Sequence, residues 1–110
     1  MDKEKTILLN GASDRSYLFT VYPWQTQLVC SSLVYVVLRR DRFGYSVLYI
    51  GSTGMLSDHM LNHPLLHEFD KAGKTHIGIH IEPSSLMRQL KQKDLIVNFM
   101  PTLNMDERKG

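Results

Sequence analysis

Residues 33–54 read LVYVVLRRDRFGYSVLYIGSTG and contain two runs of apolar and aromatic residues. The apolar and aromatic run at 33–38 predicts a strand, and the run at 47–50 predicts a second, because β-branched and aromatic residues suit the pleated surface of a sheet. The segment 39–46 between them holds charges and Gly44, the composition of a hairpin connection. The sequence therefore predicts a β-hairpin near the middle of the chain.

The chain after this hairpin predicts a helix. Residues 51–54, GSTG, are expected to break the second strand, and Ser52 or Thr53 is expected to cap the helix. Pro64 is expected to end or kink it. The apolar positions that recur at helical spacing are Met55, Leu56, Met60 and Leu61.

A third strand and a second helix follow. The segment 76–81, HIGIHI, alternates with period two, which is typical of a half-buried strand. The segment 83–85, PSS, opens the second helix, and Pro101 closes it. The apolar face of this helix is expected to consist of Leu86, Leu90 and Ile96.

Residues 1–30 are expected to form an N-terminal arm, since 1–16 are mostly polar and contain turn signals. The aromatic and β-branched run at 17–22 predicts a short strand that ends at Pro23. We expect the aromatic residues around Trp24 to cover a sheet edge or to complete a small core.

The order strand, strand, helix, strand, helix predicts a mixed α/β (α+β) domain. A small three-stranded antiparallel sheet flanked by helices would satisfy all these elements. At 110 residues the chain has room for one domain with a modest core. We expect this domain to span residues 31–104, followed by a C-terminal tail at 105–110.

Composition narrows the functional classes. The 13 Lys and Arg against 11 Asp and Glu leave a formal net charge of +2, which permits nucleic-acid binding without arguing for it. Cys30 is the only cysteine, so an intrachain disulfide and a four-cysteine zinc site are excluded. No apolar run approaches the roughly 20 residues that span a bilayer, and the N-terminus lacks the long apolar segment of a signal peptide. We expect no membrane association and a reducing cytoplasm as the compartment.

Four landmarks follow one another in a characteristic order. LVY at 33–35 begins the first strand, and YIG at 49–51 ends the second. GSTGML at 51–56 enters the first predicted helix, and 94–104 holds D-L-I, an aromatic and P-x-x-N. Together these landmarks resemble the signatures of the GIY-YIG nuclease domains. VYPW at 21–24 also looks like a segment that precedes the domain in some bacterial members.

The resemblance implies a catalytic set. The family has two tyrosines on the sheet, an arginine and a histidine on the first helix, and a glutamate on the later helix that holds a divalent metal. The metal and the arginine stabilise charge on the scissile phosphate, while a tyrosine or a metal-bound water assists the nucleophile. Carried over position by position, these places hold Tyr35, Tyr49, His59, His63 and Gln92.

Two positions depart from the family pattern, since His59 stands for the arginine and Gln92 for the glutamate. Glutamine is neutral and a poor ligand for Mg²⁺. Histidine lacks the bidentate fork of arginine, and losing one preorganised donor typically costs about 10² to 10³ in rate. The resemblance therefore implies a nuclease fold with little or no activity, which binds nucleic acid or a protein partner. The alternative is an active DNA endonuclease that uses Mg²⁺ or Mn²⁺ and substituted residues.

Basic residues indicate where nucleic acid would bind. Arg39 and Arg40 lie in the hairpin connection, and the second helix carries Arg88, Lys91 and Lys93 around the family position at 92. A solvated surface is the simplest interpretation of both groups. If phosphate contacts form here, the affinity should fall steeply with salt, because bound counterions are released.

The histidines and a relocated active site are two further alternatives. His59, His63 and His67 recur at a helical spacing of four, and His76 and His80 share one face of the third strand. Imidazoles at such spacings can bind zinc, although no cysteine assists and Pro64 interrupts the run. A relocated catalytic set would consist of Arg88, Asp58 and Asp94.

Overall fold

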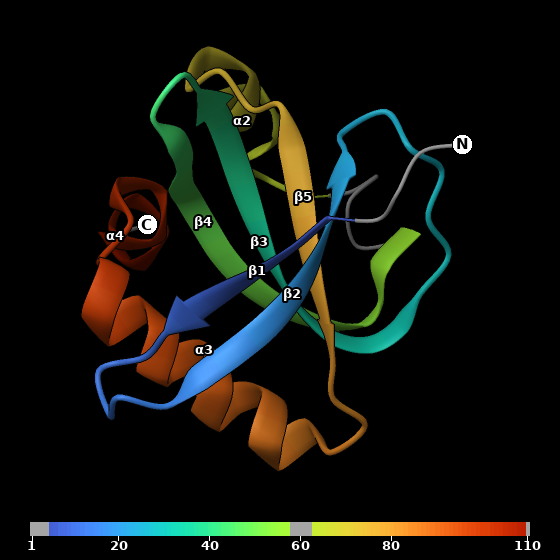
Figure 1. Cartoon of the computed structure of the whole chain (residues 1–110), viewed down its shortest axis with the longest axis vertical. Helices are drawn as coiled ribbons and strands as arrows, with labels where there is room; N and C mark the ends of the chain where they lie inside the picture. Colours follow the sequence, from blue (N-terminus) through green and yellow to red (C-terminus); the bar gives the residue numbers. More distant parts are fainter. Residues whose placement is uncertain (1–4, 58–62, 110) are drawn as a thin grey trace.

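The computed structural model of the chain describes residues 5–57 and 63–109 (Figure 1). These residues form five strands and three helices. The strands are β1 (Lys5–Asn10), β2 (Ser16–Pro23), β3 (Ser31–Asp41), β4 (Gly44–Met55) and β5 (His76–Ile81). The helices are α2 (Leu66–Lys71), α3 (Ser85–Phe99) and α4 (Thr102–Lys109).

All five strands pair antiparallel in one sheet with the order β1-β2-β5-β3-β4. The mixed α+β class is confirmed, and the three predicted strands are β3, β4 and β5. The expected count of three strands is wrong, because the segment expected to be an arm supplies β1 and β2. β2 pairs along β5, with Thr20 opposite Ile79, so that it satisfies backbone groups that β5 would otherwise expose at an edge.

Strand β2 carries the aromatic residues of the expected arm into the core. Tyr17, Phe19 and Val21 are buried at alternate positions, as the period of a strand requires. Trp24 follows β2 and packs edge-on against Phe69, with ring centroids 6.1 Å apart. The short strand predicted at 17–22 and the core role expected of Trp24 are therefore both confirmed.

Strand β3 is the centre of the fold, and its side chains from Leu33 to Leu38 have no exposed surface. Its even-numbered residues in this range pack with β1, β2 and α3, in what we call the α3-side core. Its odd-numbered residues pack against Phe69 of α2, in the α2-side core. In Figure 1, β1 crosses in front of β3, and Ile7 of β1 packs into the α3-side core together with Tyr45 of β4. The sheet therefore curls around that core.

Strand β4 is longer than predicted. The expected break at 51–54 is wrong, because Thr53 pairs with Leu33 and Met55 pairs with Ser31, so Ser52 and Thr53 lie inside the strand. Leu56 and Ser57 are helical, and positions 58–62, which include Met60 and Leu61 of the predicted first helix, lie outside the described residues. The short helix α2 was not predicted, since the helical pattern was expected to stop at Pro64.

Helix α3 begins and ends where the sequence predicts. The Ser84 hydroxyl accepts a hydrogen bond from the backbone N–H of Met87, and Met100 ends the helix in a left-handed conformation just before Pro101. The expected apolar face is wrong in part, since Leu86 and Leu90 are 64% and 52% exposed. Only the C-terminal half of α3 covers the core, where Leu95 and Ile96 are buried.

Gly51 makes room for the aromatic ring at the middle of the sheet. Tyr35 lies directly opposite Gly51 in the β3–β4 ladder. A Cβ atom at Gly51 would lie 2.4 Å from both Cζ and Oη of Tyr35, whose side chain is fully buried. The ring therefore occupies the volume that any other residue at this position would need. Gly54 lies further along the same strand and would meet no atom within 4 Å.

We predict that Gly51→Ala lowers the free energy of unfolding by about 2 to 3 kcal/mol, because overpacking a filled core forces side chains off their rotamers. The matched control is Gly54→Ala, for which we expect a change within about 0.5 kcal/mol. Urea denaturation of both variants measures the difference. Equal effects at the two glycines would contradict the packing of Tyr35 over Gly51.

Asn104 of α4 fastens the C-terminal segment to β4. Its side chain is buried, its Oδ1 accepts from the N–H of Ile50 at 2.8 Å, and its Nδ2 donates to the carbonyl of Ile50 at 2.8 Å. One amide side chain thus satisfies both backbone groups of a single residue. Without it, the buried N–H of Ile50 would lose its partner and the carbonyl would keep only the Nε2 of Gln92 at 3.4 Å. A buried group left unpaired typically costs about 1 to 3 kcal/mol.

We predict that Asn104→Ala destabilises the protein by about 1 to 3 kcal/mol, because the buried N–H of Ile50 loses its partner while the carbonyl keeps only the longer contact with Gln92. Asn98→Ala is the matched control, since Asn98 is exposed and makes one hydrogen bond, to the carbonyl of Asn10. Thermal and urea unfolding report both effects. A loss at Asn104 no larger than that at Asn98 would show that α4 is not fastened through this amide.

Candidate functional site

Three side chains at the family positions come together in the α2-side core. Tyr35 and Tyr49 lie on neighbouring strands with ring centroids 6.2 Å apart. His63 packs edge-on against Tyr49 at 5.0 Å and also contacts Phe69 at 5.0 Å. Their exposed fractions are 0% for Tyr35, 4% for Tyr49 and 6% for His63. The cluster is thus part of the packed core in this structure.

His63 also has a local structural role. Its Nδ1 accepts a hydrogen bond from the backbone N–H of Leu65 at 3.0 Å, so the ring holds the turn that leads into α2. An accepting Nδ1 carries no proton, which leaves Nε2 as the protonated nitrogen of the neutral ring.

Gln92 lies on the other side of the sheet from this cluster. Its Oε1 accepts from the hydroxyl of Ser52 at 2.6 Å, and its Nε2 lies 3.4 Å from the carbonyl oxygen of Ile50. Ile50 belongs to the α3-side core, whereas Tyr49 belongs to the α2-side core. Successive residues of a strand face opposite ways, so the Gln92 amide and the tyrosine rings approach β4 from opposite faces. His59 lies outside the described residues.

The residues present do not fit the divalent metal that the resemblance implies. Gln92 offers a neutral amide oxygen that already accepts a hydrogen bond, whereas Mg²⁺ and Mn²⁺ prefer carboxylate and water oxygens. Within 5–57 and 63–105, no three His, Cys, Asp or Glu side chains gather closely enough to hold a metal ion. We therefore assign no metal chemistry to this part of the chain.

The described histidines His67, His76 and His80 lie in separate places and contact different residues. His76 packs edge-on against Tyr45, and His67 is exposed on α2. His80 places Nδ1 2.9 Å from the carbonyl oxygen of Leu18 and Nε2 2.9 Å from Lys91. The zinc arrangement considered from the sequence is therefore not assembled by the histidines that the structure describes.

Two of the predicted basic residues on α3 are occupied within the molecule. Arg88 donates to the backbone carbonyls of Glu82 and Pro83, at 3.0 and 2.9 Å. Lys91 forms an ion pair with Glu82 at 2.7 Å, and this contact is the main cause that lowers the pKa of the Glu82 carboxyl. Lys93 is exposed. Arg88 and Lys91 thus have partners within the molecule, and nucleic-acid binding by α3 stays a prediction.

Asp94 connects α3 to the turn between β1 and β2. Its carboxylate accepts from the N–H and hydroxyl of Ser13, at 2.9 and 2.7 Å, and from the hydroxyl of Tyr17 at 2.7 Å. These bonds, first of all those from Ser13, lower the pKa of Asp94. Burial and the bond to Asp94 raise the pKa of Tyr17, which keeps its proton for this contact. Asp94 and Arg88 thus have structural contacts, and Asp58 of the relocated set lies outside the described residues.

A basic hollow opens where β1 meets the β3–β4 connection. It measures about 380 Å³, and its charged lining consists of Lys5, Arg40, Arg42 and Asp41. Among the described residues, no carboxylate forms an ion pair with any of these three cations. His76 lies nearby, and its pKa is lowered by burial and then by the charges of Arg40 and Lys5. The charges of Arg40 and Lys5 therefore act on the same neighbouring side chain. Arg39 is not part of this group, because its side chain donates to the carbonyl of Ala72 at 3.3 Å.

Sequence reasoning found Arg40 but missed Lys5 and Arg42 as part of one site. Lys5 is 35 or more positions away from the other two, and only the curl of the sheet brings it to them. The cluster RRDR at 39–42 was the available signal for the hairpin part.

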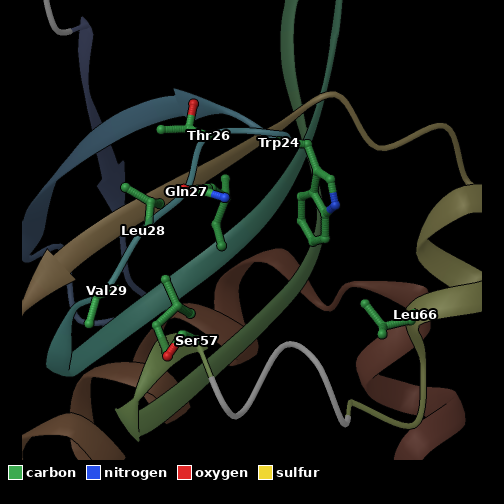
Figure 2. Close-up of a pocket in the computed structure, with 9 residues that line it drawn as sticks. Trp24, Thr26, Gln27, Leu28, Val29, Ser57 and Leu66 are labelled. Atoms are coloured by element: carbon green, nitrogen blue, oxygen red, sulfur yellow. The ribbon is translucent and has the colours of Figure 1, made fainter.

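Another hollow is mainly apolar and measures about 510 Å³ (Figure 2). Trp24, Leu28 and Val29 line it from the segment after β2, and Leu66 of α2 lines the other side. No charged side chain contributes to its described lining. It adjoins the α2-side core, to which Trp24, Leu28 and Leu66 also belong. This chemistry does not suit a phosphate group.

Comparison with known proteins yields no match. No protein-family model matches the chain, and neither the curated proteins nor the solved structures contain a similar one. The GIY-YIG resemblance accordingly stands on the sequence motifs. Of the helices in the described residues, none combines the length and the apolar character that a bilayer span requires.

We predict that Asp94→Asn lowers the urea midpoint at pH 7, and that the gap to the wild type closes as the pH falls. A carboxyl with a folded pKa below its ordinary value stabilises the fold above the unfolded pKa, about 4. That contribution is lost as the pH drops through the lower folded value, so the gap between the two proteins should narrow as the pH falls below the unfolded pKa.

Asp70→Asn is the matched control, because Asp70 is exposed and forms its ion pair with Lys74 on the surface. We expect its urea midpoint to stay close to that of the wild type at both pH values. A gap for Asp94→Asn that is the same at pH 7 and pH 3 would contradict a charged acceptor in the turn.

Proposed function

We propose that this chain is a nucleic-acid-binding protein with a GIY-YIG-like arrangement that does not perform the family's metal-dependent cleavage. The part of the proposal that denies metal-dependent cleavage rests on one observation. The tyrosines and His63 are packed in the α2-side core, while the Gln92 amide contacts β4 from the opposite face. These described groups therefore approach β4 from both faces of the sheet, an arrangement that disfavours their joint contact with one phosphodiester.

The burial of the tyrosines supports the same conclusion. A phosphate that reached Tyr49 would have to enter a region lined by Phe69 and other apolar side chains. Moving an anion from water into such surroundings is strongly unfavourable unless charged partners meet it. The rings of Tyr35, Tyr49 and Phe69 pack against each other there.

The distribution of unpaired cations supports binding. Lys5, Arg40 and Arg42 line one hollow without a carboxylate partner among the described residues. Cations gathered in this way are suited to contact phosphate, and the salt dependence of such contacts is their signature. The modest net charge of +2 favours a small number of phosphate contacts.

The proposal predicts binding without cleavage. We expect labelled single-stranded or duplex DNA or RNA to bind at low salt, with an affinity that falls between about 50 and 200 mM salt. We expect no cleavage of the same substrates with Mg²⁺ or Mn²⁺. Fluorescence anisotropy and gel analysis of one set of samples measure both.

The double reversion His59→Arg with Gln92→Glu sharpens this test. We expect it to remain inactive, because a carboxylate at 92 would still face away from the tyrosines. Cleavage by the wild type that Tyr49→Phe abolishes would overturn the proposal. Absence of binding to any nucleic acid at low salt would also overturn it, and would make a protein partner the class to test next.

A further inference from the structure

The tip of the β3–β4 hairpin presents an aromatic side chain beside the basic hollow. Phe43 is 91% exposed, the highest value among the exposed large apolar residues. It follows Arg42 and precedes Gly44, both of which line the hollow. Single exposed apolar residues are common on protein surfaces and need no explanation alone. The combination with three cations on the same end of the molecule is what distinguishes Phe43.

The hairpin tip is held in a defined shape. Asp41 lies opposite Gly44 at the end of the ladder, and its Oδ1 accepts from the N–H of Phe43 at 2.8 Å. The one acidic residue of the hollow is thus engaged in shaping the turn. Arg40 is fixed at its backbone, where its N–H donates to the hydroxyl of Thr75 at 2.8 Å, while its side chain is exposed. Aromatic and basic side chains are therefore presented from a well-anchored turn.

We propose that the β3–β4 hairpin binds single-stranded nucleic acid, with Phe43 stacked on an unpaired base and Lys5, Arg40 and Arg42 holding the adjoining phosphate. This inference rests on the proposed nucleic-acid-binding function and specifies the form of nucleic acid. Proteins that bind single strands combine a basic groove with aromatic side chains on which bases stack. The bases of a duplex are already stacked on each other, so Phe43 would have no free base to contact there.

The size and charge of the hollow agree with this ligand. A volume of about 380 Å³ lies in the range of about 300 to 1,000 Å³ typical of sites for small organic groups. Three cations against one carboxylate give the lining an excess of positive charge. The apolar hollow beside Trp24 has the larger volume but offers no cation for a phosphate.

The test measures the anisotropy of labelled strands of about 15 nucleotides in three forms: single-stranded, duplex and abasic. We expect the wild type to prefer the single strand over the duplex. Phe43→Ala should weaken binding of the single strand about 10-fold, since stacking on one base is worth about 1 to 3 kcal/mol. The same variant should have no effect on the abasic strand, and Phe43→Tyr should restore the affinity.

A second part of the test removes two of the three positive charges, in the double variant Arg40→Gln with Arg42→Gln. We expect the slope of log affinity against log salt to become shallower by about 1, because one or two phosphate contacts are lost. Lys93→Gln and Leu86→Ala are matched controls, as an exposed cation and an exposed apolar residue on α3, and should bind like the wild type. All replaced side chains are exposed, so urea denaturation should give wild-type midpoints.

The outcomes separate this inference from the proposed function. If the wild type binds nucleic acid but Phe43→Ala and the double variant bind equally well, the hairpin is not the site and the inference fails alone. A preference for duplex would likewise overturn the single-strand assignment. Displacement of the strand by millimolar pyrophosphate, with no effect of Phe43→Ala, would indicate a site for small anions instead. Absence of any nucleic-acid binding would overturn both.

Discussion

Strand β3 is buried on both faces, and its burial determines where the other strands and the helices pack. Fully burying one large apolar side chain is worth about 1.5 to 3 kcal/mol, and the range 33–38 supplies six of them. This gain is realised only if something covers each face of the strand. Helix α3 and the curled β1–β2 pair cover one face, and α2 with the segment around Trp24 covers the other. The strands added at the β5 edge are thus part of the solution.

The same constraint divides the residues that resemble a nuclease site. A side chain on β3 or β4 must enter one core or the other, because neighbouring positions alternate. Tyr35 and Tyr49 enter the α2-side core, and Ser52, two residues from Ile50, meets Gln92 on the α3 side. Two residues can therefore match family positions in the sequence, one on a strand and one on a helix, and still approach the sheet from opposite faces. The surface left for binding is then at the ends of the strands.

The sequence predicts those parts of the fold that have a local signal. The runs of β3, β4 and β5 and the caps of α3 depend on residues within a few positions of each other. The pairing of β2 with β5 does not, since it joins Thr20 to Ile79, and nothing near Thr20 indicates this partner. Likewise, the neighbours of Gly51 in the sequence predict that the strand ends there. The ring of Tyr35 on the paired strand explains why a glycine lies inside the strand instead.

The candidate site was predictable to the same degree. The proximity of Tyr35, Tyr49 and His63 is in line with the motif order, but their burial follows from how α2 packs, and α2 was not predicted. The face from which Gln92 approaches β4 depends on the docking of α3. The basic hollow combines Lys5 with a distant hairpin, so that no sequence window contains it.

The amide of Asn104 has a consequence for how this protein meets other chains. β4 is the last strand of the sheet, and the N–H and carbonyl of Ile50 point away from β3, where a further strand would add. Edge strands with free backbone groups are templates for intermolecular pairing and aggregation. The side chain of Asn104 hydrogen-bonds both groups, as the backbone of a neighbouring strand would. The middle of the β4 edge is therefore not available for pairing with another chain. The side of the sheet left open to such pairing is β1, whose first described residue is a lysine, a side chain that discourages edge-to-edge association.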